Sequence, residues 1–431
     1  MIGTLYSWLM RAMQPLLRRK LLRRGRAEPG YLEAMDERFG DYRQLAQPGA
    51  LWIHAVSLGE ARAAAILIDA LRRRAPGLRL LLTHGTATGR AEGRLLLRPG
   101  DAQTWLPWDT PEAVERFLAH FRPSAGVLME TEIWPNLVAA CVRHQVPLAL
   151  ANARLSEKSL RTSQRLSALS LPAYGALAAV WAQTEADAQR LRAAGATVSA
   201  VLGNLKFDAH PDPRQLALGR AWRAALGRPV VMLASSREGE EAALLNVLVA
   251  NRERARGGQG RRATDAVADD VQWLLVPRHP QRFAEVAALA ERSGFSVSRR
   301  GEWGDAPVPA QVWIGDSLGE MPLYYSLADV ALLGGSFEPL GGQNLIEAAA
   351  CGCPLVMGPH TFNFAEAAAT ADGCGAALRV RSLADGVRAA LALVADAPRR
   401  QAMVAAAAGF AGAYRGAADR CAQALLALAA H

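Results

Sequence analysis

Short apolar runs alternate with helical patterns along the chain, and this alternation constrains the fold more than any other feature of the sequence. The first series of expected strands comprises Leu51–Val56, Leu78–His84, Gln103–Leu106, Ala125–Met129, Pro147–Ala151, Ala179–Ala182 and Val198–Leu202. The second series comprises Val230–Ala234, Val271–Val276, Ser296–Ser298, Val312–Ile314, Val330–Leu333, Leu355–Met357 and Leu378–Val380. Strands separated by helices favour a parallel sheet covered on both faces. The sequence therefore predicts an α/β protein with two Rossmann-like halves.

The length and composition agree with this prediction. A chain of 431 residues is too long for one ordinary core, which favours two domains of roughly 200 residues each. Its 51% hydrophobic and 21% charged residues exclude a disordered protein. The net charge of +9 favours an acidic partner, such as nucleic acid, an anionic membrane or a phosphorylated substrate. Five scattered cysteines without a secretory signal indicate reduced, cytosolic thiols.

Two stretches between the expected elements are predicted to be irregular. Residues Phe207 to Pro213 contain two prolines and are typical of a linker between the halves. Residues Asn251 to Asp270, rich in Arg, Gly, Ala and Asp, are expected to form a surface loop. Two halves joined by a short linker are expected to face each other across a cleft, which is a usual place for a ligand site.

The first 26 residues have the pattern of an amphipathic helix. An apolar stripe recurs at helical spacing at Ile2, Leu5, Leu9, Met13 and Leu16, with Tyr6 and Trp8 on its flank. A basic cluster follows at Arg18, Arg19, Lys20, Arg23, Arg24 and Arg26. The apolar run is too short to cross a bilayer, and Pro15 interrupts it. We expect this segment to lie on an anionic leaflet, the alternative being a helix packed on the protein's own surface.

The stretch Leu51 to Glu60 predicts a strand, a tight turn and the start of a helix. In an open α/β sheet such a turn lies at the carboxyl end of a strand, where ligands bind. It places the carboxylate of Glu60 in the first turn of a helix, whose dipole should keep it ionised. Glu60 is therefore a candidate general base, although a first-turn acid can also serve the helix alone.

The loops after three strands of the second half are small or polar. The Ala234–Gly239 loop can hold a phosphate at a helix start, or its serines can simply cap that helix. Arg278 suits a phosphate, and the glycines at 334–335 and 341–342 allow close backbone approach to a ligand. Glu347, one turn into the next helix, can accept hydrogen bonds from ribose hydroxyls. Together these loops predict a nucleotide-type donor site.

Acids and an arginine follow the strands of the first half. Glu130 and Glu132 come directly after a strand, and Trp134 can stack on a sugar or cover the helix start that Pro135 marks. Arg154, after the next strand, can meet an anion or form a structural salt bridge.

Several common motifs are missing. The sequence has no GxxxxGK[ST] loop, no GxGxxG before the first helix and no Asp-x-Asp pair, which argues against an ATPase, a dinucleotide dehydrogenase and a metal-dependent transfer. Cys351, Cys353 and His360 do not have the spacing of a usual zinc site. We therefore expect neither a metal nor a cofactor.

Colinear motifs covering nearly the whole chain make it similar to a known family. They are HAVSLGE at 54–60, METEIWPN at 129–136, ANARLS at 151–156, NLKFD at 204–208, VPRHPQRF at 276–283, GDSLGE at 315–320, GGQNLIEAAACG at 341–352 and GPHTFNF at 358–364. Together they resemble 3-deoxy-D-manno-octulosonic acid (Kdo) transferases. The chain departs from the family's pattern at His84, where threonine is usual, and at Arg237 and Gln343, where histidines are usual.

The resemblance implies a GT-B glycosyltransferase that moves Kdo from CMP-Kdo to the lipid A precursor lipid IVA with inversion and without a metal. It implies that Glu60 is the general base. It also implies that CMP is contacted by Pro277, Arg278, Leu318, Gly319, Glu320, Asn344, Leu345, Ile346 and Glu347.

The resemblance also assigns roles to the expected domains. Residues 1–40 would be a basic membrane arm, 41–207 the acceptor domain with the base, 208–412 the CMP-sugar donor domain and 413–431 a C-terminal helix, possibly returning to the first domain. The enzyme would lie on the cytoplasmic face of the inner membrane, with CMP-Kdo, phosphorylated glycolipid and anionic lipid as partners, and no nucleic acid. The alternatives are another GT-B enzyme of envelope synthesis, such as a lipid A disaccharide synthase or a heptosyltransferase, and a non-catalytic nucleotide-binding module on the membrane.

Overall fold

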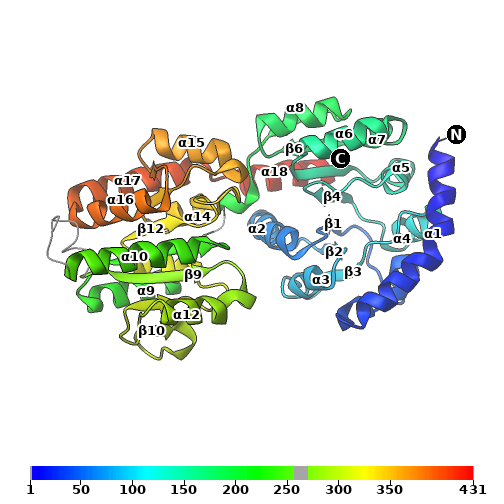
Figure 1. Ribbon diagram of the computed structural model, residues 1–431. Helices are drawn as coiled ribbons and strands as arrows, with labels where there is room; N and C mark the ends of the chain where they lie inside the picture. Colours follow the sequence, from blue (N-terminus) through cyan, green and yellow to red (C-terminus); the bar gives the residue numbers. More distant parts are fainter. Residues whose placement is uncertain (1, 209, 257–269, 431) are drawn as a thin grey trace. The chain divides into compact units, whose positions relative to one another are not determined.

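The computed structural model describes residues 2–208, 210–256 and 270–430 and divides the chain into two compact units (Figure 1). The first unit contains Met1–Asp208 and Tyr414–His431, and the second contains Ala209–Ala413. Each unit has its own seven-stranded sheet, and every strand pairing recorded is parallel. The prediction of two parallel α/β halves is therefore confirmed.

The sheet of the first unit has the strand order β3-β2-β1-β4-β5-β6-β7, which places the change of direction between β1 and β4. Its strands are β1 (Leu51–His54), β2 (Leu80–His84), β3 (Ala102–Trp105), β4 (Ala125–Met129), β5 (Leu148–Ala153), β6 (Ala179–Ala182) and β7 (Ala200–Val201). Both faces of the sheet are buried. Trp52 packs in one apolar cluster, whereas Leu51 and Ile53 pack in another. This alternation follows from the two-residue period of a strand.

The sheet of the second unit has the order β10-β11-β9-β8-β12-β13-β14. Its strands are β8 (Val230–Ser236), β9 (Gln272–Pro277), β10 (Val297–Arg299), β11 (Val312–Ile314), β12 (Val330–Leu333), β13 (Leu355–Met357) and β14 (Ala377–Arg379). The chain changes direction between β8 and β12, and open sheets bind ligands outside the carboxyl ends of strands at such a point.

Helices connect the parallel strands within each unit. Those of the first unit are α1 (Ile2–Gly25), α2 (Leu58–Arg74), α3 (Ala87–Arg94), α4 (Pro111–Phe121), α5 (Pro135–Arg143), α6 (Glu157–Arg165), α7 (Ser167–Gly175), α8 (Glu185–Ala193) and α18 (Ala417–Ala429). Those of the second are α9 (Pro213–Leu226), α10 (Glu240–Arg256), α12 (Phe283–Arg292), α13 (Met321–Leu327), α14 (Leu345–Ala350), α15 (Ala365–Gly373), α16 (Leu383–Ala395) and α17 (Ala397–Ala413).

The prediction of a loop from Asn251 to Asp270 is wrong at its start, because α10 continues through Arg256. The residues up to that point, NRERAR, contain several good helix formers and neither glycine nor proline. The part of the predicted loop at 257–269 lies outside the described residues.

The last helix, α18, belongs to the first unit, where its buried side chains share the apolar cluster of α2. The buried carboxylate of Asp208 accepts hydrogen bonds from the backbone amides of Gly416 and Ala418. These bonds satisfy donors at the start of α18 that have no partner within the helix.

The first helix, α1, contacts the first unit along one side only. Ser7, Leu17 and Leu21 are buried, and the hydroxyl of Tyr6 donates to Asp109 at 2.8 Å. Most of the predicted apolar stripe faces outward instead, since the exposed fractions of Leu5 and Leu16 are 69% and 64%. Across the described ranges 2–208, 210–256 and 270–430, we find no helix with the length and apolar character needed to cross a bilayer.

Candidate functional site

The turn between β1 and α2 holds Glu60 at the carboxyl end of the first sheet. Ser57 caps α2, and its Oγ accepts a hydrogen bond from the Glu60 amide at 3.4 Å. The Glu60 side chain turns back, so that its Oε2 accepts from the Val56 amide at 2.7 Å. The carboxylate is therefore held in one orientation at the point where the sheet changes direction.

Burial changes the acidity of this carboxylate. It raises the pKa of Glu60 to about 7, with a further increase from the carboxylates of Glu130 and Glu132 and an opposing effect from the Val56 amide. We expected the helix dipole to keep Glu60 ionised, and this expectation is wrong below about pH 7. Desolvation of the carboxylate raises its pKa by more than the helix start lowers it. A carboxylate with a pKa near neutrality is better suited to accept a proton than one with an ordinary pKa.

The loop after β2 supports the same turn from the other side. The Val56 carbonyl accepts hydrogen bonds from the amides of Gly85 and Thr86 and from the Thr86 hydroxyl, at 2.9 to 3.1 Å. A Cβ on Gly85 would lie 2.7 Å from Cγ1 of Val56, so only glycine allows this close approach. His84, at the end of β2, is buried, its Nδ1 is 2.9 Å from the Ala55 carbonyl oxygen, and burial lowers its pKa to about 4.

Glu130 follows β4, the strand beside β1, and forms salt bridges with two cationic side chains. Its backbone is left-handed with φ of 61°, and its buried carboxylate accepts from Nε of Arg154 at 2.8 Å and from Nζ of Lys206 at 2.9 Å. Both cations are half-exposed, and they share this one buried carboxylate. The salt-bridge interpretation of Arg154 is thus what the structure shows.

Lys206 received no role from the sequence, although a signal was present. The chain has 46 arginines and only three lysines, so a lysine inside a motif is conspicuous. The contact with Glu130 spans 76 residues of sequence, which local patterns do not reveal.

Trp134 and Glu132 also lie at this edge of the sheet. Trp134 is the N-cap residue of α5, with Pro135 at the first helical position, and it packs against the apolar cluster of the sheet. Glu132 lies close enough for its charge to act on Glu60, and burial raises the pKa of Glu132 itself.

In the second unit, the predicted donor residues follow β9, β11 and β12, whose carboxyl ends lie along one edge of the sheet. Pro277 ends β9, and the next residue, Arg278, is exposed while its amide donates to the Ser236 carbonyl at 3.0 Å. Leu318 and Gly319 are exposed in the loop after β11. The carboxylate of Glu320 accepts a hydrogen bond from Nη2 of Arg300 at 2.9 Å.

The loop after β12 leads into α14. The side chain of Asn344 caps this helix by accepting from the amides of Ile346 and Glu347. Leu345 and Ile346 are buried in the core, so only their backbone can meet a ligand. Burial raises the pKa of Glu347, and the positive charge of Arg278 partly offsets this effect. Arg278 and Glu347, which are 69 positions apart in sequence, are therefore brought near each other.

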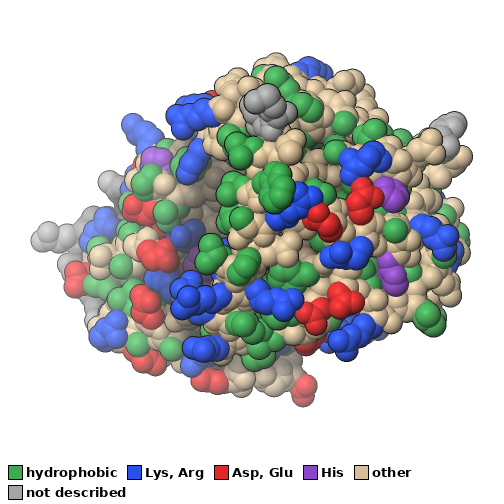
Figure 2. All heavy atoms as spheres, turned by 90° about the vertical axis from the view of Figure 1, so that its right-hand side faces the viewer, with side chains coloured by type: hydrophobic (Ala, Val, Ile, Leu, Met, Phe, Trp, Pro, Cys, Tyr) green, Lys and Arg blue, Asp and Glu red, His purple; other side chains and the backbone are tan. Residues whose placement is uncertain are grey.

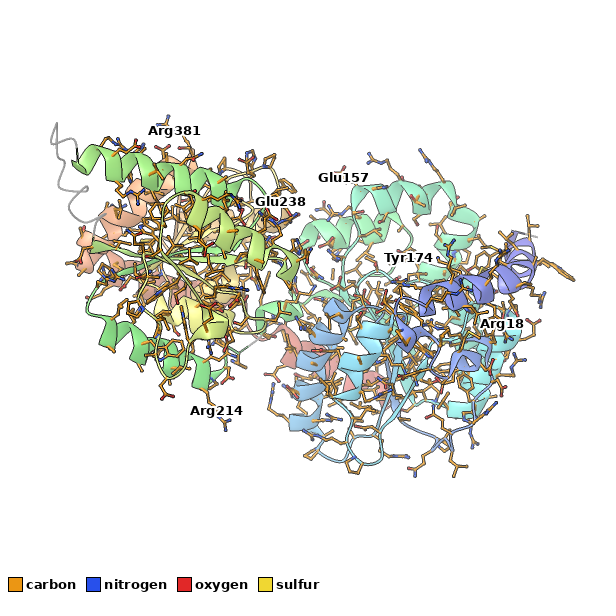
Figure 3. The ribbon with its side chains drawn as sticks, turned by 60° about the horizontal axis from the view of Figure 1, so that its bottom comes forward. Arg18, Glu157, Tyr174, Arg214, Glu238 and Arg381 are labelled. Carbon is orange, nitrogen blue, oxygen red and sulfur yellow. The ribbon has the colours of Figure 1, made fainter. Side chains whose placement is uncertain are left out.

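The carboxylates of Glu240 and Glu241 fix the loop after β8 through hydrogen bonds. Glu240 accepts from the amides of Arg237, Gly335 and Phe337 at 2.7 to 3.1 Å, and Ser236 donates to Glu241. The amide of Arg237 and the hydroxyl of Ser236 are thus occupied, which argues against the phosphate role that the sequence suggested for them. Figure 3 labels the neighbouring Glu238, which pairs with Nε of Arg237 at 3.0 Å.

The two departures from the family's pattern in this unit lie beside the same glycine. A Cβ added to Gly335 would lie 3.2 Å from Nε2 of Gln343 and 3.6 Å from Cγ of Arg237. In the part of the chain that the structure describes, no group of three or more His, Cys, Asp or Glu side chains is arranged to hold a metal ion.

Known proteins similar to this chain were found by sequence. The profile of the family described as 3-deoxy-D-manno-octulosonic-acid transferase (kdotransferase) matches residues 33–209. A 3-deoxy-D-manno-octulosonic acid transferase of Bordetella pertussis is 46% identical over 97% of this chain and 98% of its own length. Another, from Haemophilus influenzae, is 31% identical over 90% of this chain and 89% of its own length.

Comparison with solved structures identifies proteins that share the fold of this chain. A glycosyltransferase from Rickettsia africae is 12% identical, with a TM-score of 0.58 over 89% of this chain and 99% of that chain. Anabaena Alr3699/HepE in complex with UDP is 13% identical, with a TM-score of 0.57 over 88% of this chain and 99% of that chain. At such identities the likeness concerns the fold alone, and it confirms the predicted GT-B class of two Rossmann-like domains. The near-full-length match to the Bordetella protein identifies the family: the chain belongs to the 3-deoxy-D-manno-octulosonic acid transferases, and it is a glycosyltransferase.

Proposed function

We propose that the enzyme transfers Kdo from CMP-Kdo to lipid IVA with inversion at the anomeric carbon, and that Glu60 is the general base. The observation that carries the proposal is the geometry of Glu60, a half-buried carboxylate held by the Val56 amide at a strand end, with a pKa near 7. The choice of donor and acceptor rests on the family to which the chain belongs.

In the proposed step, Glu60 takes the proton from an acceptor hydroxyl while that oxygen attacks the anomeric carbon of Kdo. The bond from this carbon to the phosphate oxygen breaks on the opposite face, so that CMP leaves and the configuration inverts. The Arg278 guanidinium would stabilise the charge on the leaving phosphate. We further propose that this chemistry needs no metal, with Pro277, the 318–320 loop and residues 344–347 holding CMP.

The same proposal places the enzyme on the cytoplasmic face of the inner membrane through α1. Leu5, Trp8 and Leu9 have exposed fractions of 69%, 63% and 55%, and a basic segment follows them in the same helix. The face of the molecule drawn in Figure 2 shows Lys and Arg side chains beside hydrophobic ones. An exposed apolar stripe with neighbouring cations is the combination that binds an anionic leaflet.

The reaction is tested by mass spectrometry of the product. Purified enzyme is incubated with CMP-Kdo and lipid IVA, and the lipid is expected to gain the mass of one or more Kdo residues. Replacement of CMP-Kdo by UDP- or ADP-sugars is expected to give no product. A lipid whose mass stays unchanged with CMP-Kdo would overturn the proposed reaction.

The pH dependence of the reaction should follow Glu60. Because the base must be ionised, kcat/KM is expected to rise about tenfold per pH unit below pH 7 and to level off above it. The measurement is initial rate against pH at low lipid IVA concentration, with circular dichroism to show that the fold is intact over the range. A profile that is flat between pH 5.5 and 8 would contradict this assignment.

Substitution of the exposed apolar side chains of α1 should release the enzyme from lipid. A variant with Leu5, Trp8 and Leu9 replaced by serine is expected to show a vesicle-bound fraction lower by about tenfold or more, since each large apolar side chain contributes about 1.5–3 kcal/mol when buried. Flotation with vesicles containing anionic phospholipid measures this fraction. The control replaces Leu45 and Leu95, which lie elsewhere on the unit and are even more exposed, at 98% and 80%, and it should leave binding unchanged.

A further inference from the structure

The position of the Glu60 carboxylate depends on Val56, whose peptide groups are held from two directions. Its amide donates to Glu60 Oε2 at 2.7 Å, and its carbonyl accepts from the Gly85 amide at 3.1 Å. A shift of the loop after β2 would therefore move the amide that orients the base.

Arg38 holds the carbonyl of the peptide between Gly85 and Thr86, and the amide of that same peptide, that of Thr86, donates to the Val56 carbonyl at 2.9 Å. This arginine lies in the short 3-10 helix Met35–Phe39, and its Nη2 donates to the Gly85 carbonyl at 3.1 Å. The guanidinium lies 3.7 Å from the ring centroid of Trp105, and the Trp108 amide donates to the Arg38 carbonyl at 2.7 Å. Both ends of the residue are thus fixed.

The environment of Arg38 is unusual for a charged side chain. Its exposed fraction is 4%, and no carboxylate of the described residues lies within ion-pair distance of it. Burial lowers its pKa only to about 10, so it remains a cation at neutral pH. An unpaired buried charge is costly, and the bond to Gly85 and the stacking on Trp105 offset only part of that cost.

We propose that Arg38 is a positioning residue for Glu60: by holding the Gly85 carbonyl, it keeps the Val56 amide directed at the catalytic carboxylate. The inference rests on the proposed role of Glu60 and extends it to a residue that does not touch substrate. Its chain of contacts runs from Arg38 through Gly85 and Val56 to Glu60.

Arg38 also lies where the N-terminal helix meets the sheet. The Tyr31 ring stacks on Trp105 at 6.3 Å, and the guanidinium of Arg24 in α1 lies 4.3 Å from the Tyr31 ring. Arg18, labelled in Figure 3, lies over the ring of Phe39, the residue after Arg38. The positioning contact therefore comes from the same segment that follows the proposed membrane helix.

The charged and titratable groups around both ends of this chain of contacts define the test. Arg38 is surrounded by Tyr31, Arg90, Arg24 and Glu37, and its charge also acts on the buried His54 of β1. Glu60 faces the carboxylates of Glu130 and Glu132, and the Ser57 hydroxyl donates a hydrogen bond to it. Substitution of Arg38 leaves the second set in place, so a change in the titration of Glu60 would report on the Val56 amide.

The experiment compares the pH profiles of kcat/KM for Arg38→Met, Arg38→Gln and Arg38→Lys. Methionine and the shorter glutamine cannot hold the Gly85 carbonyl, so the acid-side midpoint is expected to rise by about one pH unit, with roughly fivefold less activity at pH 7 and near-normal activity at pH 9. Lysine keeps a charged donor and should return the midpoint most of the way to the wild-type value. NMR titration of the Glu60 carboxyl provides a readout without substrate.

The matched control is Arg90→Met. Arg90 is also buried and its guanidinium lies 4.8 Å from the Trp105 centroid, but its Nη1 donates to the Glu33 carbonyl rather than to Gly85. Its loss should lower thermal stability without moving the midpoint. If Arg38→Met does not fold, Arg38→Gln decides the question.

An unchanged midpoint in the folded Arg38 variants, or an equal shift in Arg90→Met, would overturn the inference. Failure of the proposed function is a separate outcome, since it would appear as an active Glu60→Gln enzyme. An inactive Glu60→Gln protein together with an unshifted Arg38→Met profile would refute only the role of Arg38.

Discussion

Glu60→Gln is expected to lower kcat by about 10²–10⁴-fold, because an amide cannot accept the proton of the attacking hydroxyl. Glutamine has nearly the same shape and can still accept the Val56 amide hydrogen bond, so the turn should keep its structure. Transfer is measured by product mass against time, CMP-Kdo binding by calorimetry, and the fold by thermal unfolding. Donor affinity should stay within about twofold of the wild type, since Glu60 and the donor loops belong to different units.

The matched control for this variant is Glu132→Gln. This neighbouring carboxylate is also half-buried, and its charge raises the pKa of Glu60. Its removal should keep the maximal rate and move the acid-side midpoint to lower pH, which is the opposite of the shift expected for Arg38→Met. A Glu60→Gln enzyme with the wild-type rate, or a Glu132→Gln enzyme that loses all activity, would assign the base to another residue.

Glu241→Leu is expected to reduce the local stability of the second unit by about 3–5 kcal/mol, since it leaves Arg282 buried without its main partner. Glu241 is 1% exposed on its side chain and accepts two hydrogen bonds from Arg282, at 2.8 and 3.2 Å, and one from Ser236 at 2.7 Å. Hydrogen exchange of the β8 and β9 amides measures the change. Arg282 lies four residues after Arg278, in the short 3-10 helix Pro280–Arg282, so donor binding should weaken in parallel.

Two further variants separate the lost pair from lost packing. Glu241→Gln keeps an acceptor for Arg282 and should cost less than Glu241→Leu. The double variant Glu241→Leu/Arg282→Met replaces the pair by apolar side chains and should recover much of the stability, because no unpaired charge remains. If the double variant is less stable than Glu241→Leu alone, the exposed contact of Arg282 with Glu285 or the packing of its stem matters more than the buried pair.

Much of the fold could be predicted from the sequence because strand-forming patterns are local. Trp52 and its neighbours in β1 are buried on both faces, and such a strand appears as a continuous apolar run. The turn at Ser57 and the helix start before Glu60 also have local signals, a capping residue and an acid three positions later. The predicted loop start at Asn251 was wrong because the prediction used local composition only. A helix end rich in charged residues has the same composition as a surface loop.

The candidate site was predictable only in part. Glu60 and Arg278 follow strands, and their place at a sheet edge could be inferred. The pKa of Glu60 could not be inferred, because it depends on burial and on carboxylates that follow another strand. The role of Glu240 at the amides of Gly335 and Phe337 was also missed, since these partners are about 95 positions away in sequence.

The sequence by itself determined which segments become strands and which family the motifs resemble. The tertiary structure alone decided that β11 rather than β10 lies beside β9, that Lys206 and Arg154 share the buried Glu130, and that Arg38 reaches the turn of Glu60 through Gly85. The physical reason is the separation along the sequence over which each effect acts. Periodicity and capping act over a few residues, whereas desolvation and ion pairing depend on groups that only folding brings together.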